Sequence, residues 1–225
     1  MPPFLPVTLV SSRLVLRWPT QEDIPRLYAI FTHAEVMRFW GSPPWSDEAQ
    51  AVASLTGVQE DYATGSAMEF GVERRSDGLL LGTCTLFHFN WPCRRAEMGY
   101  ALGRDAWGHG YMNEALHLLV NYAFGELDLH RLEADIDPRN AASARTLERL
   151  GFRLEGLLRE RWIVAGEISD TGFYGLLRRE GVVVNRKRVQ RVYRAAGLSV
   201  RRRPRKRVAM ERVPKPAVTL ANRRW

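Results

Sequence analysis

The chain has 225 residues, of which 45% are hydrophobic, and it carries a formal net charge of +8. This length is sufficient for one domain with a single apolar core. The two cysteines are too few for a disulfide framework or a cysteine-rich metal cluster, so the sequence predicts no metal site. It also contains no apolar run long enough to span a bilayer and no secretory signal at its start, and we therefore expect a cytoplasmic protein.

The positive charge is confined to one end of the sequence. Residues 1–174 contain 16 Arg, no Lys and 23 acidic residues, a net charge of −7, whereas residues 175–225 contain 14 Arg, 3 Lys and 2 Glu, a net charge of +15. An asymmetry of this size indicates that two kinds of polypeptide have been joined. We therefore divide the chain into a domain over 1–178 and a basic tail over 179–225.

The first predicted elements are a strand and an amphipathic helix. Residues 8–18 predict the strand, because Leu14 and Leu16 alternate with Arg13, Val15 and Arg17. Thr20 is the predicted N-cap of the helix, and Glu22 and Asp23 place negative charge in its first turn, where the helix dipole favours it. The apolar stripe of this helix consists of Ile24, Leu27, Tyr28, Ile30 and Phe31.

A segment rich in glycine and proline, 41–44, interrupts the regular pattern. It lies within a group of large apolar side chains, and two interpretations of this group remain open. The side chains either belong to the core, which is the more frequent fate of aromatic residues, or they line a substrate cleft. The group consists of Met37, Phe39, Trp40 and Trp45. Residues 46–63 then predict a second N-capped helix.

Three further strands are predicted over residues 67–74, 79–89 and 94–102, with a turn at Ser76–Gly78 between the first two. Apolar residues at helical spacing follow from Met112 to Phe124, and after this helix the pattern continues as strand, helix, strand and strand. Four early strands with two helices inserted after the first predict a mixed α+β fold with a mostly antiparallel sheet flanked by helices.

Two glycines stand where the strand 94–102 gives way to the helix. Gly108 and Gly110 allow the backbone to approach a ligand closely, and the unpaired N–H groups at the start of the helix favour an anion. A tight turn that needs glycine for its own conformation is an equally good interpretation of this stretch alone. The stretch matches neither the dinucleotide-binding fingerprint nor the P-loop.

This stretch and a second block resemble the GNAT N-acetyltransferases, most closely the branch of ribosomal-protein N-terminal acetyltransferases. The resemblance covers about residues 8–178, and it depends on motifs that occur in the family's order. These motifs are 12–17, 97–100, 107–115, 137–143, 147–152 and 166–170. One residue departs from the general pattern, because Asp105 stands where the family begins its pyrophosphate loop with Gln or Arg.

The resemblance implies the GNAT fold, in which a central strand and its neighbour splay apart to admit the pantetheine arm of acetyl-CoA. It places Asn140 against the pantetheine amides, although the residue pattern alone makes Asn140 a helix N-cap. Arg145 could contact the coenzyme's phosphates, and a solvated surface charge is the alternative. The implied acetyl-CoA-binding residues are Tyr100, Ala101, Leu102, Trp107, Gly108, His109, Gly110, Tyr111, Met112, Asn140 and Arg145.

The expected reaction is direct attack of a primary amine on the thioester. An α-amine is largely protonated at neutral pH, so the enzyme must remove a proton before attack. We predict Glu97 as the catalytic base and Ser143 as the acid that protonates the departing thiolate. Some members of the branch offer a carboxylate later in the chain, and there this sequence has Trp162, with Glu160 two residues earlier.

The acceptor and the tail are less constrained. A net charge of −7 suits a cationic acceptor, and the resemblance favours the N-terminal α-amine of a protein over a polyamine or an aminoglycoside. The tail, 179–225, resembles the DNA-binding segment that precedes the integrase-like domain of insertion-sequence transposases, and we expect it to be partly helical or disordered. Such a basic segment is expected to bind nucleic acid weakly and non-specifically, and the alternative is that its charge serves no function. A nucleic-acid-binding protein with a vestigial acetyltransferase domain is the alternative function.

Overall fold

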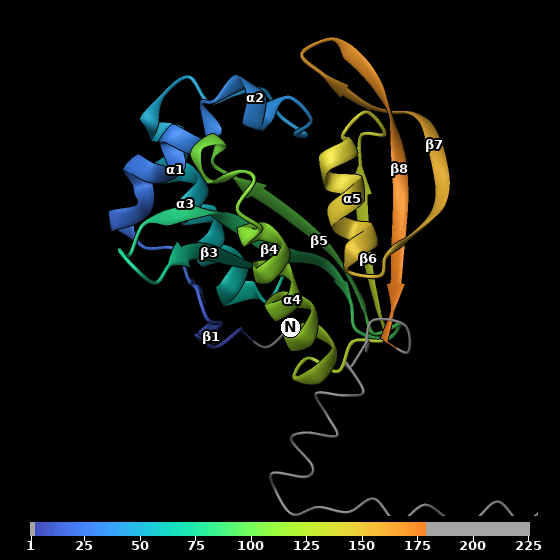
Figure 1. The fold of residues 1–225 in the computed structure, drawn as a ribbon, viewed down its shortest axis with the longest axis horizontal. Helices are drawn as coiled ribbons and strands as arrows, with labels where there is room; N and C mark the ends of the chain where they lie inside the picture. The colour runs from blue at the N-terminus through green and yellow to red at the C-terminus, as the bar shows by residue number, and fades with distance from the viewer. Residues whose placement is uncertain (1–2, 179–225) are drawn as a thin grey trace, which may run out of the picture. The chain divides into compact units, whose positions relative to one another are not determined.

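The structure, a computed structural model, describes residues 3–178 (Figure 1). Its centre is an eight-stranded sheet with the strand order β1-β2-β3-β4-β5-β6-β8-β7. The strands are β1 (Leu9–Val10), β2 (Leu14–Arg17), β3 (Met68–Arg74), β4 (Leu80–Asn90), β5 (Arg95–Leu102), β6 (Arg131–Ile136), β7 (Arg153–Val164) and β8 (Glu167–Leu177). The helices are α1 (Ile24–Phe31), α2 (Ala34–Met37), α3 (Glu48–Thr64), α4 (Tyr111–Gly125) and α5 (Ala141–Arg149), with 3₁₀ turns at Gln21–Asp23 and Arg104–Ala106.

The mixed α+β architecture predicted from the sequence is confirmed. Each adjacent pair of strands is antiparallel except β5 and β6, which run parallel. One part of the prediction is wrong, because the single strand expected over 8–18 is a hairpin in which Leu9 of β1 pairs with Leu16 of β2. The hydroxyl of Ser11 accepts a hydrogen bond from the amide of Leu14 and so turns the chain between them.

The helix predicted over 46–63 begins at Glu48 in the structure, two residues later than expected. Asp47 is the N-cap of α3, and its carboxylate accepts a hydrogen bond from the amide of Ala49 at 2.9 Å. The side-chain oxygen of Gln50 reaches back to the amide of Ser46 at 2.7 Å. Ser46 therefore lies outside the helix and is held by it, as in a capping box.

The helices cover the sheet with two separate apolar clusters. The larger cluster contains the buried side of α4, including Leu116 and Leu119, packed with strands β2 to β6. The smaller contains the stripe of α1, with Leu27 and Ile30 packed against Ala101 of β5. The stripe predicted for α1 therefore does form an interface with the sheet, and β5 is held from both sides.

Strands β5 and β6 pair over only a short length. The register joins Arg95–Glu97 to Arg131–Glu133, whereas β5 continues to Leu102 and β6 to Ile136. Beyond these three pairs the two strands diverge, and Figure 1 shows the opening between β5 on one side and β6 with α5 on the other. The splay implied by the family resemblance is therefore present.

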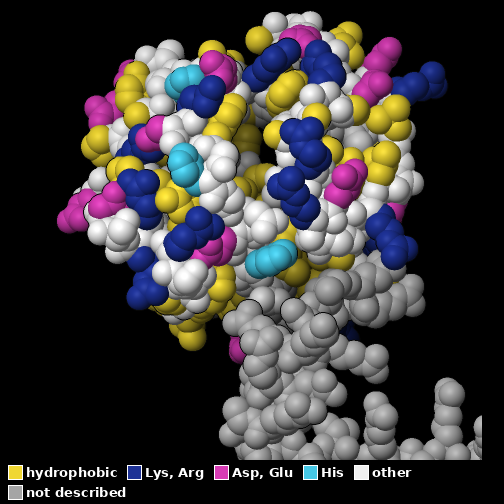
Figure 2. Space-filling view, in the orientation of Figure 1, with side chains coloured by type: hydrophobic (Ala, Val, Ile, Leu, Met, Phe, Trp, Pro, Cys, Tyr) yellow, Lys and Arg dark blue, Asp and Glu magenta, His cyan; other side chains and the backbone are white. Residues whose placement is uncertain are grey.

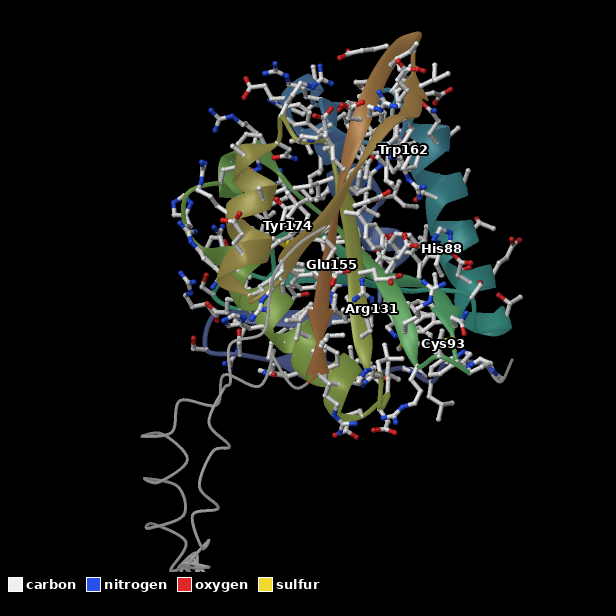
Figure 3. The ribbon with its side chains drawn as sticks, turned by 90° about the vertical axis from the view of Figure 1, so that its right-hand side faces the viewer. His88, Cys93, Arg131, Glu155, Trp162 and Tyr174 are labelled. Atoms are coloured by element: carbon white, nitrogen blue, oxygen red, sulfur yellow. The ribbon has the colours of Figure 1, made fainter. Side chains whose placement is uncertain are left out.

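Ion pairs hold the strands together where the splay begins. Glu133 of β6 is buried, and its carboxylate lies 2.5 Å from Arg95 of β5 and 2.7 Å from Arg131. Arg131 also pairs with Glu155 of β7 at 2.5 Å, and Figure 3 shows these two side chains facing each other across β8. The three strands β5, β6 and β7 are thus linked by one network that we call the Glu133 clamp.

None of the helices in the described part of the chain is long and apolar enough to cross a membrane.

Candidate active site

A cavity of about 620 Å³ lies where β5 and β6 diverge. Its walls come from the end of α2 and the loop after it, from the middle of β3, β4 and β5, from β6 and the start of α5, and from β7 and β8. Figure 2 shows the surface hollowed between the part that carries α1 and α2 and the part that carries α5 and β7. The predicted site residues that line the cavity are Glu97, Tyr100, Asn140 and Ser143.

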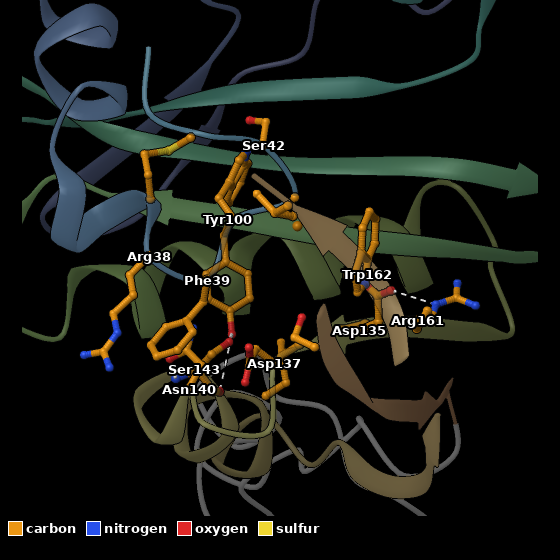
Figure 4. A pocket seen from close by; sticks show the side chains of 18 of the residues that line it. Arg38, Phe39, Ser42, Tyr100, Asp135, Asp137, Asn140, Ser143, Arg161 and Trp162 are labelled. Carbon is orange, nitrogen blue, oxygen red and sulfur yellow. Dashed lines mark hydrogen bonds and ion pairs between the residues drawn. The ribbon is translucent and has the colours of Figure 1, made fainter. Parts of the chain in front are cut away.

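Ser143 and Tyr100 meet across the cavity. The hydroxyl oxygens are 2.6 Å apart, so one donates to the other, and Figure 4 shows the contact between β5 and α5. Burial raises the pKa of Tyr100 to about 12, so its hydroxyl keeps its proton at neutral pH. The predicted acid Ser143 is therefore in direct contact with the neutral hydroxyl of Tyr100, which can donate or accept a proton. The sequence pattern did not indicate this contact.

Asn140 caps α5 as its position predicts. Its side-chain oxygen accepts a hydrogen bond from the amide of Ser143 at 3.0 Å, and the side chain also borders the cavity. The cap orients the first turn of α5 and thereby the Ser143 hydroxyl. Whether Asn140 also binds the coenzyme remains a prediction.

We expect Asn140→Ala to lower the free energy of unfolding by about 1 kcal/mol, because the Ser143 amide loses its acceptor. Asn140→Asp keeps the cap oxygen and is expected to retain the stability, so it serves as the control. Urea unfolding of both variants measures the difference. Equal stability of the alanine and aspartate variants would show that the cap contributes nothing.

The predicted base, Glu97, lies on β5 within the cavity wall. One carboxylate oxygen is 3.3 Å from Nδ1 of His88 on β4, whose side chain is largely exposed. Glu97 is thus an ion-pair partner of a titratable group as well as a cavity residue. At the place where other members of the branch have a carboxylate, Trp162 of β7 lines the cavity, whereas Glu160 lies outside the cavity wall.

A second carboxyl in the cavity wall was missed by the sequence analysis. Glu69 lies on β3, directly opposite Thr85 of β4, and the Thr85 hydroxyl donates to its carboxylate at 3.1 Å. Burial raises the pKa of Glu69 to about 7, and the charge of Asp61 adds to the effect. The signal in the sequence was weak, because Glu69 is one of two acidic residues, with Glu73, in the predicted strand 67–74.

The pKa of Glu69 predicts a pH-dependent stability. A carboxyl whose pKa rises from about 4.5 in the unfolded chain to about 7 in the fold destabilises the protein as pH rises through this window. Glu69→Gln removes this effect, so the variant should exceed the wild type in free energy of unfolding by about 3 kcal/mol at pH 8 and by less than about 0.5 kcal/mol at pH 4.5. Urea unfolding at several pH values measures the difference, and a constant difference would place the pKa of Glu69 outside this window.

The predicted pyrophosphate loop leads into α4 with two left-handed residues. Gly108 has φ = +81° and Gly110 has φ = +74°, and both conformations strongly favour glycine. Within α4 the amide of Glu114 is bonded to the carbonyl of Gly110, so the amides before it lack an intrahelical acceptor. The turn therefore presents N–H groups of the kind that bind an anion.

Arginines surround this loop. The Arg13 guanidinium donates to the carbonyl of His109 at 3.0 Å and lies over the Tyr111 ring, and that of Arg104 lies over the Trp107 ring. Each of these arginines also pairs with a carboxylate, Arg13 with Glu114 at 2.6 Å and Arg104 with Glu35 at 2.7 Å, so the attraction of the turn for an anion comes chiefly from the N–H groups of the helix N-terminus. The loop residues Trp107, Gly108, His109, Gly110, Tyr111 and Met112 lie outside the cavity wall, as do Ala101, Leu102 and the exposed Arg145.

The unusual Asp105 has a structural partner. Both of its carboxylate oxygens accept from one guanidinium nitrogen of Arg26, at 2.7 and 2.8 Å, and this contact lowers the pKa of Asp105. Arg26 belongs to α1 and also donates to the carbonyl of Leu80. The residue that departs from the family pattern therefore fixes the loop to α1.

The aromatic group around 41–44 proves to be both core and cavity wall. Trp40 and Trp45 pack against Phe31 of α1, which supports the core interpretation, while Phe39 and Trp40 also line the cavity. A Cβ on Gly41 would lie 3.4 Å from the Trp162 ring. The loop after α2 thus closes one end of the cavity against β7.

Within residues 3–178, no group of three or more His, Cys, Asp or Glu side chains is arranged to hold a metal ion.

The sequence matches the model of the acetyltransferase (GNAT) domain over residues 13–153. It is 34% identical to the uncharacterized N-acetyltransferase p20 of Bacillus licheniformis over 173 residues, which cover 77% of this chain and 97% of that protein. It is 28% identical to two Escherichia coli K12 enzymes, the spermidine N(1)-acetyltransferase (69% of this chain, 81% of the enzyme) and the [ribosomal protein uS5]-alanine N-acetyltransferase (73% and 87%).

The fold is also that of solved acetyltransferases. The structure of spermidine N-acetyltransferase from Vibrio cholerae, in complex with CoA and spermine, superposes with a TM-score of 0.68 over 76% of this chain and 99% of that one, at 22% identity. Members of the family use acetyl-CoA as the acetyl donor. The splayed strands and the glycine turn agree with these matches. The chain therefore belongs to the GNAT family and is an acetyl-CoA-dependent N-acetyltransferase.

Proposed function

We propose that this enzyme transfers the acetyl group of acetyl-CoA to a primary amine that enters the cavity between β5 and β6. The observation that carries the proposal is the arrangement of the cavity beside the strand that leads into the glycine turn. An anion held at that turn and an arm laid along β5 would bring a thioester to the cavity wall. The amine would then meet the carbonyl carbon from the acceptor side.

The residues present fit the cosubstrate. The amides between Gly108 and Met112 would hold the diphosphate, with the guanidiniums of Arg13 and Arg104 nearby. The edge of β5 that does not pair with β6, from Tyr100 to Leu102, would bond the pantetheine amides, and Asn140 would face them from α5. The Leu102 carbonyl accepts a hydrogen bond from the Trp107 indole at 2.7 Å. Arg145 stands on the exposed side of α5, where it would reach only the outer phosphates.

Ser143 is the proposed acid. Its hydroxyl lies beside Tyr100 at the edge of the cavity, so a proton given to the departing thiolate could be replaced from the Tyr100 hydroxyl. Two carboxyls in the wall, those of Glu97 and Glu69, are not paired with arginine, and one of them accepts the proton of the amine. Glu97 is the base predicted from the sequence.

The acceptor we favour is the N-terminal α-amine of a protein. The relative that acetylates the alanine of ribosomal protein uS5 supports this class, and the spermidine acetyltransferases support a polyamine as the alternative. The acidic charge of residues 1–174 suits either of these, and an aminoglycoside as well. We place the enzyme in the cytoplasm, where all three occur.

The basic tail, 179–225, lies outside the described residues. We propose that it derives from the DNA-binding segment of a transposase and binds nucleic acid weakly through its net positive charge. A protein that acts through this tail alone, with a vestigial domain, is the second candidate. It predicts a domain that no longer binds coenzyme A.

The two candidates are separated by a thermal shift of the full chain with acetyl-CoA. A ligand that binds only the folded state at 100 times its Kd adds about 2.7 kcal/mol to the stability, so a functional enzyme should melt at a higher temperature. Thiol release from acetyl-CoA is then measured with an alanine-starting peptide, spermidine and an aminoglycoside. No shift and no thiol release with any acceptor would overturn the proposed function.

A further inference from the structure

Glu69 is the one carboxyl of the cavity wall for which the described residues supply no basic side chain as a partner. Its side-chain partner there is the hydroxyl of Thr85, and no salt bridge joins it to an Arg, Lys or His of residues 3–178. The other acidic side chains of the wall each contact a basic side chain. These pairs are Glu97 with His88, Asp135 with Arg161, Asp137 with Arg139, and Glu167 with Arg139.

The register of the sheet extends this contact toward the splayed edge. Glu69 of β3 stands opposite Thr85 of β4, and Thr85 stands opposite Gly99 of β5. Facing residues of neighbouring strands project on the same side of the sheet, so the row runs across the cavity floor. It ends at β5, the strand that β6 leaves after Glu97.

Gly99 leaves the end of this row open. A Cβ at Gly99 would lie 3.4 Å from the Phe87 ring, and without it the space beside Thr85 is accessible from the cavity. The Thr85 hydroxyl gives its proton to Glu69, so its oxygen lone pairs remain available to a donor on the cavity side. An ammonium group over Gly99 is such a donor.

We propose that Glu69, acting through the Thr85 hydroxyl, takes the proton that the acceptor amine must lose before it attacks the thioester. Glu97, two residues along β5 from Gly99, then holds the ammonium group in place through its charge. This assignment rests on the proposed function and replaces Glu97, which contacts His88, with a carboxyl that has no basic partner among the described residues.

The acceptor amine loses two protons in the reaction. One proton of the R–NH3+ group passes to Oγ1 of Thr85, and at the same time the Thr85 hydroxyl proton passes to Glu69, which becomes neutral. The nitrogen lone pair forms the N–C bond, the C–S bond breaks, and its electron pair leaves on sulfur. The second proton lost by nitrogen ends on that sulfur, so an ammonium ion, a thioester and a carboxylate give an amide, a thiol and a carboxylic acid.

The surroundings of Glu69 suit a proton acceptor at neutral pH. Burial raises its pKa to about 7, close to that of an α-amine, so proton transfer between the two is nearly balanced. The titratable and charged groups near it, on α3, on β4 and in the cavity wall, are Asp61, Tyr62, Cys84, His88, Glu97, Arg38, Asp135, Arg161, Asp137, Arg139 and Glu167. Of these, Asp61 favours the protonated form of Glu69.

The test is the pH dependence of kcat/KM in the full chain with an alanine-starting peptide and with spermidine as acceptors. We expect the kcat/KM of the wild type to fall as the pH drops below a pKa near 7, which gives the profile an acidic limb. Glu69→Gln should remove this acidic limb and lower kcat at least 100-fold. Thr85→Val should resemble Glu69→Gln, and Thr85→Ser, which restores the hydroxyl, should recover the limb. Glu97→Gln should raise KM and retain the limb of the pH profile.

A limb that persists in Glu69→Gln but vanishes in Glu97→Gln would overturn the proposal. A limb due to the amine itself differs between the two acceptors and is recognised by that difference. The titration of Glu69, followed by carbon-13 NMR of the side-chain carboxyl with acetyl-CoA present, decides the matter without turnover. A pKa below about 5.5 refutes the proposal even if neither acceptor reacts, whereas failure of all acceptors with a pKa near 7 refutes only the proposed function.

Discussion

Replacing Glu133 by alanine is expected to lower the free energy of unfolding by about 3 kcal/mol. The side chain is buried, and its loss leaves the guanidiniums of Arg95 and Arg131 without their shared carboxylate. Breaking a buried ion pair costs about 3–5 kcal/mol, and the lower end applies because both arginines keep some contact with water. Urea unfolding measures the loss.

Glu155 provides the matched control for this prediction. It binds the same Arg131 at 2.5 Å but is 41% exposed, so Glu155→Ala should cost less than about 1 kcal/mol. A similar loss in both variants would show that burial of Glu133 is not the cause. The Glu133 variant should also lose affinity for acetyl-CoA, because the clamp fixes where β5 and β6 part.

Gly108→Ala is expected to weaken the binding of coenzyme A about tenfold or more. Alanine at φ = +81° is strained by about 1 kcal/mol, and the methyl group would project from a turn whose amides we assign to the diphosphate. Apart from the two neighbouring residues in the chain, no atom of residues 3–178 lies within 4 Å of the added Cβ, so a clash with this part of the protein is not the reason. Isothermal titration calorimetry with coenzyme A measures the effect.

Gly78→Ala separates the strain from the ligand. Gly78 has φ = +71° in the turn between β3 and β4, and among the described residues, apart from its two chain neighbours, its added Cβ would also meet no atom within 4 Å. Both variants should therefore lose about the same stability, while only the Gly108 variant loses affinity. Equal affinities would show that the diphosphate binds elsewhere.

Much of the fold follows from patterns within short stretches. The apolar stripe of α1, the cap at Asn140 and the turn at Gly78 depend on residues a few positions apart, and each of these predictions is confirmed. The prediction of a single strand over 8–18 included the polar run Ser11–Arg13, which forms the turn of the hairpin. The turn depends on side-chain bonds, among them the bond from Ser11 to the distant Glu114 at 2.6 Å.

The site was predicted less completely, for a physical reason. The role of Asp105 depends on Arg26, which lies 79 positions away in the sequence, and the environment of Glu69 depends on its neighbours across the sheet. A carboxyl's pKa is set by burial and by the charges around it, and neither is visible in a local pattern. Glu97 was recognised from its strand, whereas its contact with His88 needed the register of β4 and β5.

The divergence of β5 and β6 gives the protein two sheet edges that face each other inside one molecule. An outer edge of this kind invites another chain to add a strand, and proteins must protect it. Here α5 and the β7–β8 hairpin stand beside the inner edges, so an intruding strand has little room, while a slender arm of amides can enter from the end. The same backbone groups can therefore stay available for a cosubstrate without becoming a seed for aggregation.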